Sequence, residues 1–141
     1  MGMMLRPPAR WTAAILFVLT AFFAASSAWP QGLSPATITV HLSSFAFTPD
    51  RLLLRAGTPV RLHLVNDSSR GHDFSAPALF AASTFLGRTL PDRGTIELHG
   101  DTSADIVFVP RLPGTYKVRC THFLHSLFGM TAIVVVQAVP P

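Results

Sequence analysis

Residues 119–130, RCTHFLHSLFGM, and the run TAIVVV that follows at 131–136 decide the fold of this chain. They contain its only cysteine, two of its six histidines and one of its four methionines. The preceding segment, 114–120 (GTYKVRC), alternates between apolar and polar side chains, so a strand there directs Cys120 into the interior. A β-branched run, typical of another strand, begins directly after Met130. The cysteine therefore enters a loop between two strands that holds several metal-binding side chains.

The sequence beyond residue 30 consists largely of short alternating segments separated by turn residues such as TPD, RAGTP, NDSSRG and RLPGT. Six segments read as strands: 36–43, 58–66, 94–100, 104–110, 114–120 and 129–137. This spacing predicts an all-β domain, either a β-sandwich or a Greek-key barrel. One segment is different, because 75–90 is rich in Ala, Leu and Phe and carries Pro77. We expect a short inserted helix near 77–86.

Residues 1–28 have the organisation of a signal peptide. Arg6 and Arg10 precede an uncharged apolar run over 11–29, and Ser26 and Ala28 have the spacing read by a signal peptidase. Cleavage after Ala28 would leave one domain at 29–141. An uncleaved anchor is the alternative, since the run is barely long enough to cross a bilayer of ~30 Å. Both alternatives predict a periplasmic or extracytoplasmic domain.

Charge and cysteine content narrow the function classes further. Residues 29–141 hold nine Lys and Arg against seven Asp and Glu, a net charge of +2. Nothing in this balance indicates nucleic-acid binding. A single cysteine excludes a disulfide within the chain, and a lone thiol in an oxidising compartment is a liability unless something occupies it.

The loop after Cys120 predicts a copper site. Its spacing is Cys-x4-His-x4-Met, with His125 and Met130 as the other donors. Thiolate, imidazole and thioether are soft ligands that select copper. A trigonal site of two histidines and one cysteine, with a weak axial methionine, requires a second histidine. His72 in RGHDF, 48 residues before the cysteine, can supply it from another strand end.

Three motifs together resemble the cupredoxins, the family of blue copper proteins. They are GHDF (71–74), PGTYKVRCT (113–121) and CTHFLHSLFGM (120–130), and the resemblance extends over 36–137. It implies a Greek-key β-sandwich that holds one type 1 copper ion cycling between Cu(II) and Cu(I). The ligands implied by the resemblance are His72, Cys120, His125 and, in the axial position, Met130.

The resemblance also concerns residues beside the ligands. Thr121 matches the Ser or Thr that helps to tie the loop in the family, whereas Asp73 stands where relatives often have Asn. The family usually carries Pro or Gly just before the loop histidine, and this chain reads Thr-His-Phe-Leu-His. His122 is therefore a rival ligand to His125. We favour His125 because Cys-x-His is too tight for both side chains to reach one metal from a strand end.

Other polar motifs are expected to have ordinary structural roles. His41 and His63 occupy outward strand positions and His99 lies in a turn, so we expect all three to face solvent rather than a metal. The triplet at residues 66–68, Asn-Asp-Ser, matches a glycosylation site, but a turn explains it equally well.

The leading functional hypothesis is a small exported electron carrier, and not an enzyme, because no acid–base pair is visible. Copper delivery or storage with the same ligands is the alternative, and a second loop histidine, His122, favours it. A third hypothesis is an adhesion-like sandwich in which the cysteine has no role. For the carrier we expect a redox protein to dock near His125, and membrane contact only if the N-terminal segment stays uncleaved. Apolar residues flank that histidine and either collar it or fill the core of the loop: Phe123, Leu124, Leu127 and Phe128.

Overall fold

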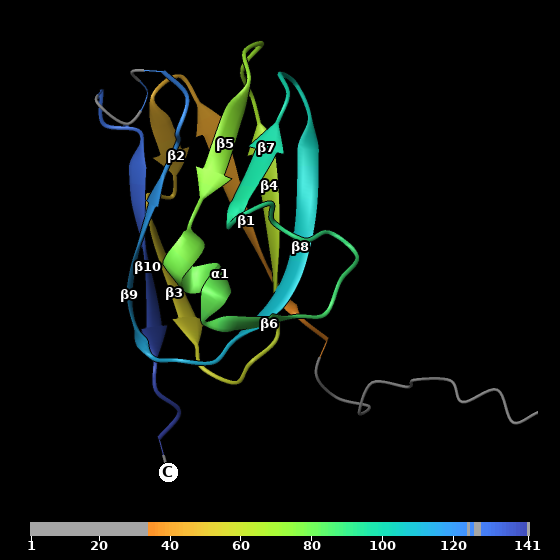
Figure 1. Ribbon diagram of the computed structural model, residues 1–141, viewed down its shortest axis with the longest axis vertical. Coiled ribbons are helices and arrows are strands. Elements are labelled where there is room, and N and C mark those ends of the chain that lie inside the picture. The colour runs from red at the N-terminus through yellow and green to blue at the C-terminus, as the bar shows by residue number, and fades with distance from the viewer. Residues whose placement is uncertain (1–33, 124, 126–127, 141) are drawn as a thin grey trace, which may run out of the picture.

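Two five-stranded sheets pack face to face in the computed structural model, which describes residues 34–140 except 124, 126 and 127 (Figure 1). The predicted signal peptide at 1–28 lies outside these residues, as do residues 29–33 and Leu124 and Leu127 of the predicted collar. The first sheet has the order β2 (Ala46–Thr48), β1 (Ala36–Ser43), β4 (Val60–Asn66), β8 (Ser103–Pro110) and β6 (Ser83–Phe85). The second has the order β3 (Arg51–Arg55), β10 (Thr131–Gln137), β9 (Gly114–Arg119), β5 (His72–Ser75) and β7 (Thr95–Leu98). The predicted all-β sandwich is confirmed.

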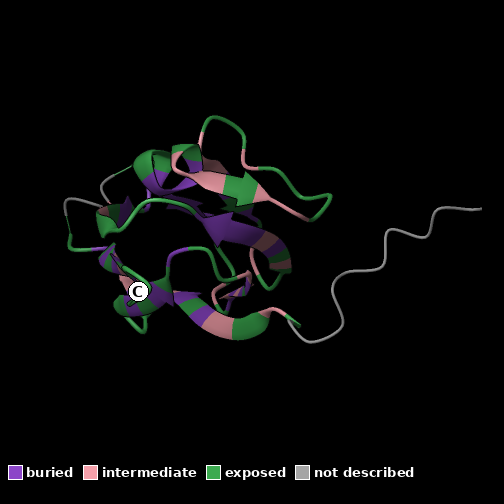
Figure 2. Ribbon diagram, turned by 90° about the horizontal axis from the view of Figure 1, so that it is seen from below, coloured by how far each residue is buried: buried purple, intermediate pink, exposed green. Residues whose placement is uncertain are grey.

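Alternation along the strands builds the core between the sheets. In β4 the side chains of Val60, Leu62 and Leu64 are buried while Arg61 is exposed, as the sequence predicts. The buried side chains line the interior of the sandwich, and the exposed ones lie on its outer surfaces (Figure 2). Each large apolar side chain taken out of water contributes ~1.5–3 kcal/mol. The two sheets therefore form a stiff frame for the loops at their ends.

The predicted helix over 77–86 is too long. Helix α1 covers only Pro77–Ala81, and its second half is replaced by β6. The Ser83 hydroxyl donates to the carbonyl of Leu79 over 2.7 Å, which ends the helix with a side-chain bond. Thr84 then pairs with Val109 in antiparallel register. Pairing with an available edge of β8 outweighs the weak intrinsic helix preference of this short segment.

Sequence reasoning missed four strands: β2, β3, β5 and β6. Strand β3 reads RLLLR, so its outward Leu53 conceals the alternation with the buried Leu52 and Leu54. Strand β5 reads HDFS, and all four residues are buried. Within the described part of the chain, no helix has the length and apolar character needed to cross a membrane.

Candidate metal centre

Three of the predicted ligands lie together at one end of the sandwich, where β9 ends and β5 and β10 begin (Figure 1). His72 is the first residue of β5, and Cys120 directly follows β9. His125 lies in the loop that leads to β10. Because β5 and β9 are neighbours in the same sheet, the fold brings together two segments that are far apart in the sequence.

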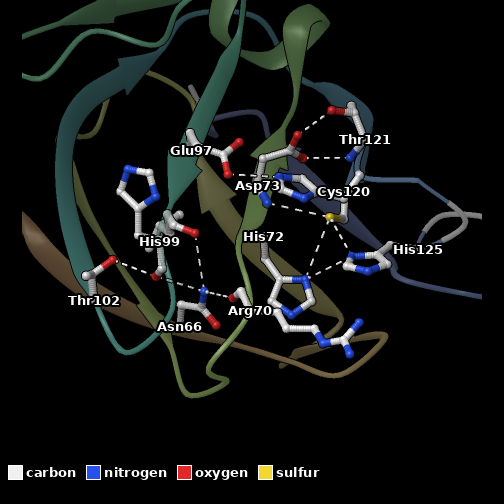
Figure 3. Close-up of polar contacts among 12 residues, drawn as sticks. Asn66, Arg70, His72, Asp73, Glu97, His99, Thr102, Cys120, Thr121 and His125 are labelled. Carbon is white, nitrogen blue, oxygen red and sulfur yellow. Dashed lines mark hydrogen bonds and ion pairs between the residues drawn. The ribbon is translucent and has the colours of Figure 1, made fainter.

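The donor atoms of these three residues face one another (Figure 3). The Nδ1 atoms of His72 and His125 are 3.1 Å apart. The sulfur of Cys120 lies 3.4 Å from Nδ1 of His125 and 3.8 Å from Nδ1 of His72. Metal bonds of ~2.0–2.3 Å to nitrogen and sulfur place neighbouring donors about 3–4 Å apart around one ion. The spacing of the three atoms therefore fits one shared transition-metal ion.

Met130 is held against the same site by its backbone. Its carbonyl accepts a hydrogen bond from the Cys120 amide over 3.1 Å, and its amide donates to the His125 carbonyl over 2.9 Å. The side chain is completely buried and belongs to the core. The loop is thus closed at both ends by main-chain bonds, which fix the residues of the Cys-x4-His-x4-Met spacing relative to one another.

Asn66 fixes the turn that leads into His72. Its side-chain amide donates to the carbonyls of Arg70, Leu98 and His99 over 2.7, 3.3 and 2.9 Å. Asn66 is only 1% exposed, and a buried side chain of this kind is not available for glycosylation. The interpretation of this triplet as a turn is therefore the correct one.

A second polar cluster holds the ligand loop from outside. Nε2 of His122 lies 2.8 Å from Oε1 of Glu97 on β7, and the cluster includes Asp73. The His122 ring is nearly parallel to that of His125, with centroids 5.7 Å apart. Gly71 leaves room for this pair, because a Cβ there would lie 3.2 Å from His122 Cε1 and 3.3 Å from Glu97 Oε1. Sequence reasoning missed Glu97, since an outward glutamate on a strand carries no signal of its own.

Asp73 links β5 to the cysteine segment. Its backbone amide points at the Cys120 sulfur over 3.5 Å. Its carboxylate accepts hydrogen bonds from the Thr121 amide, over 2.7 Å, and from the Thr121 hydroxyl. The tie between Thr121 and the residue after His72 is therefore made, with Asp in place of the family's usual Asn. Asp73 is 2% exposed, so this carboxylate depends on these donors for its stability.

Burial shifts the titration of two candidate ligands. Desolvation lowers the pKa of His72, and the neighbouring His125 and His122 lower it further, against the opposing charge of Asp73. Desolvation raises the pKa of the Cys120 thiol, and backbone hydrogen bonds from Asp73 and His122 oppose that shift. A neutral imidazole is the form that binds a metal, whereas the thiol must lose a proton to bind.

Aromatic side chains surround His125 on the solvent side. Phe123 is 86% exposed and Phe128 is 62% exposed. Phe45, in the turn between β1 and β2, packs edge-on against the His125 ring at 5.1 Å and against Phe128 at 5.5 Å. Sequence reasoning missed Phe45, although a large apolar residue between two short strands is a possible signal. Its backbone φ of 64° lies in the left-handed region, which is rare for a bulky residue.

The remaining histidines lie away from this centre, as predicted. His41 bonds to Asp67 over 2.5 Å and His63 to Asp105 over 2.9 Å, both on the outer side of the first sheet. His99 is exposed in the turn after β7. None of the three joins a group of metal-binding side chains among the residues described here.

Comparisons with known proteins agree with this arrangement. A sequence model of the cupredoxin-like domain family matches residues 13–136. A search of curated proteins found no significant match. Among solved structures, reduced auracyanin from Roseiflexus castenholzii aligns with a TM-score of 0.57 at 19% identity, covering 75% of this chain and 99% of that one.

Two further auracyanins align over a similar length. Auracyanin B gives a TM-score of 0.56 at 26% identity, with 74% of this chain and 91% of that chain covered. Auracyanin A of Chloroflexus aurantiacus, described as a blue copper protein, gives 0.54 at 20% identity, with 74% and 100% covered.

Proposed function

We propose, because the chain belongs to the cupredoxin-like domain family, that it is a small exported type 1 copper protein that carries electrons between redox partners. The observation that carries the proposal is the convergence of the Cys120 sulfur with the Nδ1 atoms of His72 and His125, all within 3.8 Å of one another. Copper bound there would take up one electron as Cu(II) and release it as Cu(I).

Each donor has a distinct role in this proposal. The Cys120 thiolate and the imidazoles of His72 and His125 form the trigonal set, and the Met130 thioether is the weak axial ligand. His72 comes from a buried strand and the others from a loop closed by main-chain bonds. Rigid donors limit the rearrangement between the two oxidation states, which is what rapid electron exchange requires. The proposal contains no catalytic residue, since the electron is the only species transferred.

The exposed aromatic collar of Phe45, Phe123 and Phe128 around His125 is the proposed docking site of a redox partner. Apolar side chains with this exposure around a ligand edge suit a small transient interface, below ~1,200 Å². Leu124 and Leu127, the other predicted members of the collar, lie outside the described residues.

Copper delivery or storage is the less favoured function. That hypothesis drew support from His122 as an additional copper ligand in the loop. The His122 ring is hydrogen-bonded to Glu97 instead, and this observation favours the carrier.

Visible and electron paramagnetic resonance spectroscopy of the purified protein loaded with Cu(II) tests the proposal. We expect an intense thiolate-to-copper band and narrow copper hyperfine splitting. Cys120→Ser should lose both, whereas His63→Ala, a control on the outer face of the other sheet, should keep them. A colourless wild-type protein with an ordinary tetragonal copper signal would contradict the proposal and favour copper delivery.

A further inference from the structure

The outer side of β3, β10 and β9 forms an exposed surface that the metal centre does not use. Alternation turns every second residue of these three adjacent strands toward solvent. We call this surface the basic face. Its residues are Arg51, Leu53, Arg55, Thr115, Lys117, Arg119, Thr131, Ile133, Val135 and Gln137.

The strand register gives the basic face an apolar centre and charged margins. Ile133 on the central strand lies opposite Arg51 on one side and Lys117 on the other. Leu53, which is 57% exposed, pairs with Val135 beside it. An apolar patch rimmed by charge is typical of an interaction surface rather than of ordinary solvated strands.

The four cations of the basic face lack acidic neighbours. No residue of the face is acidic, and none of its arginines or its lysine lies within 4.0 Å of a carboxylate of any described residue. The outer side of the first sheet is different, because Arg61 there lies 3.6 Å from Asp105 and His41 bonds to Asp67. Residues 29–141 carry a net charge of only +2, so four uncompensated cations on one side make the molecule strongly asymmetric.

The basic face also lies close to the metal centre. Arg119 directly precedes Cys120 on β9, with the arginine exposed and the cysteine buried. A protein docked on this side would therefore lie one residue along the chain from the sulfur donor. This position has a use for a redox partner, whereas binding to a lipid surface would gain nothing from it.

We propose that the basic face docks the acidic surface of a protein redox partner. This inference rests on the proposed electron-carrier function and adds a second docking surface, on the side of the sandwich, to the collar at its end. Unpaired cations raise the rate of encounter with an acidic surface and orient it, and the effect weakens as salt is added.

Nuclear magnetic resonance mapping with polyglutamate as the acidic probe tests this proposal on the reduced, copper-loaded protein. We expect shifted amide resonances in β3, β9 and β10 at low salt. The variant Arg51→Gln/Lys117→Gln removes the two cations that flank Ile133 and should weaken binding about fivefold. Arg61→Gln/Arg88→Gln removes the same charge elsewhere and should change it less than about twofold.

Three outcomes would overturn the proposal. Equal weakening in both variants would mean that net charge alone attracts the probe. Shifts confined to 121–130 would place binding at the collar. Binding to phosphatidylcholine–phosphatidylglycerol vesicles through the basic face, without binding to polyglutamate, would assign the face to a membrane. The map does not depend on the colour of the copper site, so failure here is distinct from failure of the proposed function.

Discussion

The amide of Asp73 donates to the sulfur of Cys120 over 3.5 Å, which joins the start of β5 to the residue after β9. The carboxylate of the same residue holds the amide and hydroxyl of Thr121. One side chain therefore fixes the cysteine segment to the strand that begins with His72. It also places a carboxylate close to the sulfur donor, where many relatives are neutral.

Asp73→Asn should keep the fold and raise the reduction potential of the copper-loaded protein. The asparagine oxygen can accept from the Thr121 amide, and its NH₂ can donate to the Thr121 hydroxyl. Removing a negative charge near the site disfavours Cu(II) relative to Cu(I), by an amount on the order of tens of millivolts. Voltammetry measures the change, and Asp105→Asn on the other sheet is the control. An unchanged or lower potential would show that this carboxylate does not act on the metal.

His125→Ala should abolish the thiolate-to-copper band, whereas His122→Ala should preserve it. The Nδ1 atom of His125 lies 3.4 Å from the Cys120 sulfur, and the His122 ring bonds to Glu97 instead. Absorption spectra of the two copper-loaded variants measure the difference. Loss of the band in His122→Ala alone would exchange the roles of the two loop histidines.

Copper binding should release about one proton at neutral pH, from Cys120. Burial raises the pKa of this thiol, so the metal-free protein holds the proton that the bound thiolate must lose. Burial lowers the pKa of His72, so that imidazole is already neutral above its ordinary pKa of 6.5 and releases no further proton there. Calorimetry in buffers of different ionisation enthalpy counts the protons, and Cys120→Ser should release none. Wild-type binding without proton release would contradict the protonated thiol.

The same raised pKa makes the metal-free fold sensitive to alkaline pH. The folded state binds the Cys120 proton more tightly than the unfolded chain does, so this contribution to stability is present below the ordinary thiol pKa of 9.0. It is lost as pH rises from that value through the raised folded pKa. Urea unfolding of the metal-free protein should show this loss, and Cys120→Ala should remove it.

Phe45→Gly should lower the reduction potential with little loss of stability. Glycine relieves the left-handed backbone, worth about 1 kcal/mol, which offsets the lost contacts of a side chain that is already 44% exposed. Without the phenyl ring, water reaches His125 and stabilises the more highly charged Cu(II) site. Voltammetry and thermal melts measure the two effects. Leu90→Gly in an exposed loop is the control, and an equal fall in potential there would contradict the prediction.

The sequence by itself determined the chemistry and the local structure. Alternation in GTYKVRC places Cys120 inward, and the spacing to His125 and Met130 names a soft donor set, because both features depend only on neighbouring residues. The short strand β5 and the end of α1 were missed or misplaced. Their four- and five-residue segments are too short for periodicity to be visible.

Only the tertiary structure decided which distant residues meet. The pairing order of β9, β5 and β7 brings His72 to Cys120 and Glu97 to His122. The same kind of pairing places β10 between β3 and β9 and so collects the basic face from three separate segments. Strand order depends on how both sheets bury their inner sides together, and this long-range property is not contained in the pattern of any one strand.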